Sequence, residues 1–397
     1  ALDLTDCVLM YSQPRAYQVI DDETHPVEVA YHVNGDSYGF TVGNYDSSKE
    51  LVIDPLLQAT YFGGSGNDEV RDIGIAPNDS VYAVGSTNSV ISSFSLTPDG
   101  TDAFVAWFSQ SLGNLQAVSF IGGTAASGRI DEALTVAFRV ISSDTFDVYV
   151  AGYTSSPDLA GIATGVSADD TYSDVLVETE GFVTRLSSDL VTLYRSTYYG
   201  GDTVATTGSP NDSISTIAIS NDGVFITGRT STNNIQMLTD QAPSFGAYIC
   251  GNSDAFDARH RFDLTSLAAA TYLGGTGDDE AMGLALDSTT AYIAGHTDSS
   301  DLEGVTAGSY QDALAGGKDA FVTAVDLSLT GTVNSTYIGG ALEENVQAIA
   351  NTGTEPTDTL LYIAGNSASD NFPLGAATAT FATPNDSFIA RINKDLA

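Results

Sequence analysis

The stretch Thr271–Thr297, TYLGGTGDDEAMGLALDSTTAYIAGHT, recurs in modified form along most of the chain. Its clearest mark is an aromatic residue, then any residue, then a Gly-Gly pair. The five copies are Tyr61–Gly64, Phe120–Gly123, Tyr198–Gly201, Tyr272–Gly275 and Tyr337–Gly340. Self-similarity on this scale predicts that the chain repeats one small structural unit several times.

Each copy of the unit predicts four strands. The Gly-Gly pair is followed by an acidic residue and a short apolar strand, and a second strand then ends in glycine. A third strand contains a phenylalanine, and a fourth runs into the next aromatic-Gly-Gly mark. Short alternating segments of Val, Ile, Tyr and Thr, with no helical period, predict an all-β chain. Four strands with periodic glycines and aromatic residues are typical of β-propeller blades.

The count of strands predicts how the repeats close. Five copies of the first three strands and five of the fourth strand are present, but the first fourth strand, Leu56–Phe62, precedes every blade. We therefore expect Leu56–Phe62 to lie beside Ser387–Ile392 and to complete the last blade, which removes an exposed sheet edge. The prediction is a five-bladed β-propeller over residues 51–397, closed by an N-terminal strand.

Residues 1–50 lack the repeat and predict a small N-terminal β appendage. Its candidate strands are Cys7–Tyr11, Ala16–Ile20, Val27–Val33 and Tyr38–Val42. Isolated hairpins are marginally stable. We therefore expect the appendage to pack against the main body or to act as an assembly arm toward a neighbouring chain.

The repeat resembles a known family. The segments TYLGGTGDDEAMGLALD, AYIAGHTDSSD and KDAFVTAVD resemble the SBBP-type β-propeller repeats of secreted bacterial and archaeal proteins, and Asn371–Pro373 fits that family's common tail. The leader that begins PRAYQVIDDETHPVEVAYHV resembles the module that often precedes those repeats. The resemblance implies blades and an extracellular or cell-surface location, and it implies no particular activity.

Charge limits the partners. The chain has 51 acidic and 13 basic residues, a net charge of -38. Such a surface repels nucleic acid and anionic membranes, so we expect neither as a partner. No apolar run reaches 18 residues, so we expect no membrane insertion. An acidic, lysine-poor composition suits high salt, which screens self-repulsion, and is typical of secreted proteins of halophilic or marine microbes.

The acidic residue after each Gly-Gly pair has two interpretations. A closed ring would bring these residues near one end of the central channel: Asp68, Asp131, Asp212, Asp279 and Glu344. Each could cap backbone N–H groups of its own turn, which repetition in every unit favours. Alternatively they could bind a cation, with Ca²⁺ favoured by hard oxygen ligands. No other cofactor is indicated.

The sequence contains candidate sites for a disulfide and for glycosylation. Cys7 and Cys250 could form one long-range disulfide or remain two buried thiols. Four Asn-x-Ser/Thr sequons are candidate glycosylation sites: Asn78, Asn211, Asn334 and Asn385. Asn334 is the best of these, because the other three have aspartate in the middle position.

No catalytic motif is present. The chain has no G-x-S-x-G, P-loop or dinucleotide-binding pattern, and His25, His32, His260 and His296 lack metal-ligand spacing. We therefore predict a non-enzymatic, secreted structural or adhesive protein that assembles with itself in a filament or cell-surface layer. The alternative is a propeller that binds cell-surface glycans, with Tyr172, Phe245, Tyr248 and Tyr310 as candidate stacking residues. A polysaccharide-cleaving enzyme is a weaker alternative, because any two of so many carboxylates could be chosen as a catalytic pair.

Overall fold

The computed structural model describes residues 2–396, apart from residues 5–6, 10–13, 21–22, 35–36, 55–58, 92–97, 99, 125–128, 143–144, 173–178, 202–210, 233–234, 236–250, 331–333, 354–359 and 374–384. All regular structure in the described residues is β-strand, which confirms the all-β prediction. Contacts divide the chain into two compact units. The first is Ala1–Phe62 with Phe108–Gln116, and the second is Gly63–Trp107 with Ala117–Ala397.

In the described residues the first unit contains three small antiparallel sheets. The first pairs β1 (Leu2–Leu4) with β2 (Cys7–Leu9). The second has the order β4 (Glu23–Val27), β3 (Arg15–Ile20), β7 (Val52–Asp54), and the third pairs β5 (Val29–Asn34) with β6 (Ser37–Val42). The short strand β7 pairs with β3, a partner that its sequence pattern did not predict. The buried side chain of Gln18 holds the loop that follows β6. Its Nε2 donates to the Asp46 carbonyl at 2.7 Å, and its Oε1 accepts the Asp46 N–H at 2.8 Å.

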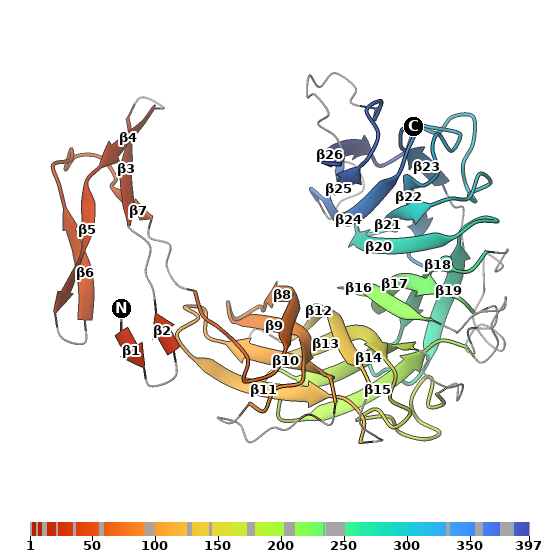
Figure 1. The fold of residues 1–397 in the computed structure, drawn as a ribbon, viewed down its shortest axis with the longest axis horizontal. Coiled ribbons are helices and arrows are strands. Elements are labelled where there is room, and N and C mark those ends of the chain that lie inside the picture. Colours follow the sequence, from red (N-terminus) through yellow and green to blue (C-terminus); the bar gives the residue numbers. More distant parts are fainter. Residues whose placement is uncertain are drawn as a thin grey trace. The chain divides into compact units, whose positions relative to one another are not determined.

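Five antiparallel sheets that follow one another in chain order make up the described part of the second unit, except that the end of β10 and the start of β11 fall in the first (Figure 1). The first sheet contains β8 (Asp68–Ile75), β9 (Val81–Thr87), β10 (Asp102–Phe108) and β11 (Leu115–Ile121). The second contains β12 (Asp131–Ser142), β13 (Thr145–Thr154), β14 (Glu180–Ser187) and β15 (Leu193–Tyr199). The third contains β16 (Ser213–Ile219), β17 (Val224–Thr230), β18 (Asp254–His260) and β19 (Leu267–Leu273). The fourth contains β20 (Asp279–Leu286), β21 (Thr290–Thr297), β22 (Asp319–Asp326) and β23 (Asn334–Ile338), and the fifth contains β24 (Glu344–Asn351), β25 (Leu360–Ser367) and β26 (Asp386–Asn393).

The fifth sheet has three strands where the others have four. In the described part of the chain, β26 pairs only with β25. The predicted fourth strand, Leu56–Phe62, lies partly outside the described residues, and Ala59–Phe62 has no strand assignment. The structure therefore shows propeller-like successive four-stranded sheets, while the closed five-bladed ring stays a prediction.

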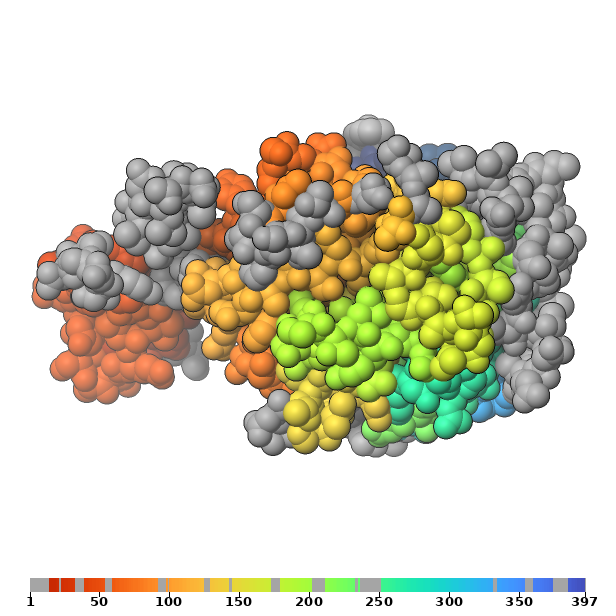
Figure 2. Space-filling view, turned by 90° about the horizontal axis from the view of Figure 1, so that it is seen from below, coloured from red at the N-terminus to blue at the C-terminus, as the bar shows by residue number. Residues whose placement is uncertain are grey.

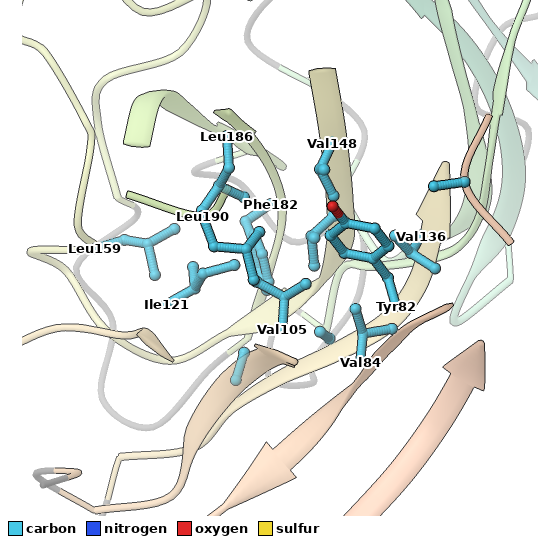
Figure 3. Close-up of a cluster of buried hydrophobic side chains, with 14 of the residues drawn as sticks. Tyr82, Val84, Val105, Ile121, Val136, Val148, Leu159, Phe182, Leu186 and Leu190 are labelled. Atoms are coloured by element: carbon cyan, nitrogen blue, oxygen red, sulfur yellow. The ribbon is translucent and has the colours of Figure 1, made fainter. Parts of the chain in front are cut away.

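The core is divided among the junctions between consecutive sheets. Four clusters of buried apolar side chains are present, and each draws its members from two neighbouring sheets. Figure 3 shows the first of them, in which Tyr82 and Val105 of the first sheet meet Val136 and Phe182 of the second. The space-filling view agrees, with atoms of successive sheets lying directly against one another (Figure 2). Burial of apolar area between sheets is thus the main force that holds neighbouring repeats together.

The glycine that marks each second strand is explained by a bulge in the first strand. Every first strand shifts register within its second to fifth residues, as at Ala281/Gly283. The bulged backbone approaches the facing glycine so closely that a Cβ on Gly295 would lie 2.0 Å from the Glu280 carbonyl oxygen. The same contact would be 1.8–2.1 Å in all five sheets, at Gly85, Gly152, Gly228, Gly295 and Gly365.

Candidate functional site

The five acidic residues predicted as a site lie at equivalent places in the five sheets. Four are the first residue of a first strand, and Asp212 immediately precedes β16. Asp68 is half-buried, whereas the other four are almost completely buried. In the second to fifth sheets these residues therefore begin the strand that packs against the preceding sheet.

Each carboxylate is held by its own turn. Asp279 Oδ2 accepts the Gly275 N–H at 2.9 Å and the Ser299 hydroxyl at 2.8 Å. Gly275 is the second glycine of the Gly-Gly pair, and Ser299 follows the second strand of the same sheet. The carboxylate thus ties the turn to the loop beyond the second strand.

The same bonds recur in other sheets. Asp68 accepts the Gly64 N–H at 2.9 Å and the Ser89 hydroxyl at 2.9 Å. Glu344 accepts the Gly340 N–H at 2.8 Å and a serine hydroxyl, from Ser367, at 2.6 Å. The serines that make these bonds, Ser89, Ser299 and Ser367, had not been singled out in the sequence, although each lies two to four residues after the glycine of its second strand.

A second acidic residue lies at each of the four junctions. It begins the third strand of the preceding sheet, and the first glycine of the Gly-Gly pair separates it from the predicted acid. A Cβ on Gly339, for example, would meet Asp319 Cγ at 2.3 Å and Glu344 Oε2 at 2.7 Å. The four pairs are Asp102 with Asp131, Glu180 with Asp212, Asp254 with Asp279 and Asp319 with Glu344.

Burial of these acids disfavours their charged forms. It raises the pKa of Asp212 to about 7 and that of Asp279 to about 6. For Asp319, burial is again the first cause of a raised pKa, and the nearby Glu344 charge adds to it. Two carboxyl groups that share a buried site favour retention of a proton by one of them. Asp212 and Asp279 therefore keep their protons to a higher pH than ordinary aspartates do.

No group of three or more His, Cys, Asp or Glu side chains in the described residues is arranged to hold a metal ion. The hydrogen bonds above are those expected of capping carboxylates, and the Ca²⁺ site stays a prediction. Cys250 lies outside the described residues, so the disulfide is not described. The four sequon asparagines, Asn78, Asn211, Asn334 and Asn385, are all exposed.

A cluster of arginines lies at the opposite end of the strands, where sequence reasoning had placed no site. A cleft of about 500 Å³ is lined by Arg139, Arg185, Asp222, Arg261, Phe262, Asp263 and Ala268. The Arg139 guanidinium lies over the Phe262 ring at 3.7 Å. Arg185 forms a 2.8 Å ion pair with Asp147, which is almost completely buried.

The cleft brings several basic residues of a very acidic chain together. Three of the chain's 13 basic residues line it, and a fourth, Arg195, donates to the Asp263 carbonyl at 2.9 Å. No ion pair forms with Arg261 in the described residues. An exposed guanidinium beside an aromatic ring can bind a carboxylate or sulfate group.

Of the four stacking residues proposed for glycan binding, the structure describes Tyr172 and Tyr310. Tyr172 packs edge-on against Tyr198 with 5.5 Å between ring centroids. Tyr310 is half-exposed, and its N–H donates to the Leu396 carbonyl. Phe245 and Tyr248 lie outside the described residues.

Comparisons with known proteins give little functional guidance. Residues 3–56 match a family model described as a domain of unknown function, DUF7948. No curated protein matches the chain. None of the described segments forms a helix that is long and apolar enough to cross a membrane.

Two solved structures resemble the chain weakly. One is the α-L-arabinofuranosidase from Lactobacillus brevis, with 11% identity, a TM-score of 0.36 and coverage of 81% of this chain and 90% of that one. The other is a subtype N10 neuraminidase-like protein of A/little yellow-shouldered bat/Guatemala/060/2010, with 10% identity, a TM-score of 0.32 and coverage of 90% and 96%. At these TM-scores the likeness carries no conclusion about activity.

Proposed function

We propose that this chain is a secreted structural or adhesive protein whose repeats form an assembly module of a filament or cell-surface layer. The five sheets are the blades of a five-bladed β-propeller, and the last blade takes the fourth strand that it lacks from Leu56–Phe62 of the same chain or of a neighbouring copy. The protein acts by packing against copies of itself, and no catalytic step is required of it.

The observation that carries this proposal is the open face of the last sheet. Ile389 on β26 is 80% exposed, whereas its counterparts in the four complete sheets are fully buried: Val105, Val183, Asp257 and Val322. Tyr362 on β25 is 37% exposed, although the corresponding aromatic residues of the other sheets are buried. A β-edge with apolar side chains is a template for pairing with another chain.

Electron microscopy and light scattering of the purified chain test the proposal. We expect polymers or layers that grow as NaCl rises from about 0.15 M toward 2 M, because a net charge of -38 opposes assembly until it is screened. A monodisperse monomer over this whole range of salt would contradict the proposal.

Glycan binding is the second candidate, and the arginine-lined cleft is the observation that favours it. Arg261 and Phe262 together suit an acidic sugar, because a guanidinium pairs with a carboxylate and an aromatic ring packs on a sugar face. A glycan array with and without Ca²⁺ tests this candidate. Retention of uronate-containing or sulfated glycans by the parent chain, lost in Arg261→Ala, would support it, and an array without signal would remove it.

A further inference from the structure

One buried carboxyl group breaks the apolar pattern of the third strands. Asp257 on β18 is fully buried, and so are the valines that occupy its place in the other complete sheets: Val105, Val183 and Val322. The preceding residue, Phe256, packs toward the second sheet, where it stacks on Tyr199 with 4.4 Å between ring centroids. Because successive side chains of a strand point to opposite faces, Asp257 points toward the fourth sheet.

The face that carries Asp257 belongs to an apolar junction. Ala255, two residues away on the same face, is part of the buried cluster that joins the third and fourth sheets. Leu284 and Phe321 are among the residues that the fourth sheet contributes to this cluster. Asp257 therefore lies where the other junctions place a hydrocarbon side chain.

The polar neighbours of Asp257 within its own sheet donate their hydroxyl protons elsewhere. Its cross-strand partners are Thr227 on β17 and Thr271 on β19. The Thr227 hydroxyl donates to the Phe256 carbonyl at 2.5 Å, and the Thr271 hydroxyl donates to the Tyr272 carbonyl at 3.0 Å. Neither carboxyl oxygen of Asp257 has a hydrogen-bond partner in the described residues.

In the described residues no charged group forms an ion pair with Asp257. Strands β17 and β19 pair with β18, and β20 packs against it. The other ionisable residues on these four strands are Arg229, Asp254, Arg259, His260, Tyr272, Asp279 and Glu280. Of these, Arg229 lies 3.8 Å from Glu280 instead. Burial therefore raises the pKa of Asp257 well above its ordinary value, and the nearby Ala258 N–H offsets this only in part.

We propose that Asp257 makes the junction between the third and fourth sheets a proton-controlled joint, which is closed while the carboxyl group keeps its proton and loosens as the pH rises. An ionised carboxylate without a partner is strongly disfavoured in an apolar interior. The folded junction therefore retains a proton that the unfolded chain releases above about pH 3.8. As the pH rises further, retention of this proton costs more free energy, and opening of the junction lets water reach the carboxylate.

Two variants test the linkage between this proton and folding. Asp257→Val introduces the residue that three other sheets have at this place, and Asp257→Asn keeps the shape of the carboxyl group without its ionisation. One linked proton changes the unfolding equilibrium constant by up to about tenfold per pH unit. Between pH 5 and pH 8, urea unfolding should therefore show the parent-to-variant ratio of unfolding constants rising at least tenfold. If Asp257→Val does not fold, Asp257→Asn alone decides.

Hydrogen exchange, corrected for the intrinsic pH dependence of amide exchange, locates the opening. In the parent chain, protection of β18 and β20 should fall between pH 6 and pH 9, whereas β12 and β13 should stay protected. In Asp257→Asn all four strands should stay protected. Asp312→Asn, at an exposed position, is the matched control and should behave as the parent does. A ratio of unfolding constants that does not change with pH, or protection lost equally at every junction, would overturn the inference.

Discussion

Gly295→Ala should lower the free energy of unfolding by about 3 kcal/mol or more, since overpacking of a closely packed site usually costs about 1–3 kcal/mol. The new methyl carbon would lie 2.0 Å from the Glu280 carbonyl oxygen and 2.8 Å from Phe321 Cε1. Neither neighbour can rotate away freely, because the oxygen belongs to a bulged strand backbone and the ring is fully buried. The β20–β21 pairing would therefore have to open locally.

Chemical denaturation followed by circular dichroism measures this loss. Gly317→Ala is the matched control, because a Cβ at Gly317 has no neighbouring atom within 4 Å. It should change the unfolding free energy by less than about 0.5 kcal/mol, as surface substitutions usually do. Equal stability of the two variants would show that the bulge does not require glycine.

Asp279→Ala should lower the free energy of unfolding by about 3 kcal/mol, because each buried donor left unpaired costs about 1–3 kcal/mol. The substitution removes the acceptor of the Gly275 N–H and of the Ser299 hydroxyl, and both bonds are buried. Asp312→Ala, at an exposed position, is the control and should be nearly neutral.

Asp279→Asn removes the ionisable group but keeps the hydrogen-bond acceptor, since the amide oxygen can still accept the Gly275 N–H. The pKa of Asp279 is raised by burial to about 6, above the ordinary value of 3.8. Ionisation therefore destabilises the folded state: the penalty is absent below about pH 3.8, grows as the pH rises, and is complete above about pH 6.

The stability of Asp279→Asn relative to the parent should consequently increase between pH 5 and pH 8, as measured by urea unfolding at each pH. Subtracting the parent curve removes the effects of other groups, such as His260, whose pKa is lowered by burial to about 4. If the difference in unfolding free energy between Asp279→Asn and the parent chain stayed constant with pH, the raised pKa of Asp279 would be contradicted.

Much of the strand pattern could be predicted from the sequence, because each strand carries a local mark. The acid before the first strand, the glycine in the second and the phenylalanine in the third recur in every repeat. The four complete sheets confirm these strand assignments. The strand β7 was missed because three residues are too few to show alternation.

The capping role of the acids could be predicted in part. Repetition indicated a carboxylate that serves its own turn, and the bonds from Gly275 and Ser299 to Asp279 are of this kind. The second acid of each junction could not be paired with the first, because Asp254 and Asp279 belong to two different sheets and come near each other only beside Gly274. The arginine cleft was missed for the same reason, since Arg139, Arg185 and Arg261 are far apart in the sequence.

The sequence by itself determined that this protein is all-β, built from repeated four-stranded units with an acid at the start of each. Those properties follow from alternation, turn residues and spacing, which act within a few residues of the chain. Only the tertiary structure decided which surfaces are covered. Ile73 and Val136 occupy the same place in the repeat, yet one is exposed and the other buried. Burial depends on whether a neighbouring sheet is present, and a local pattern carries no record of that neighbour.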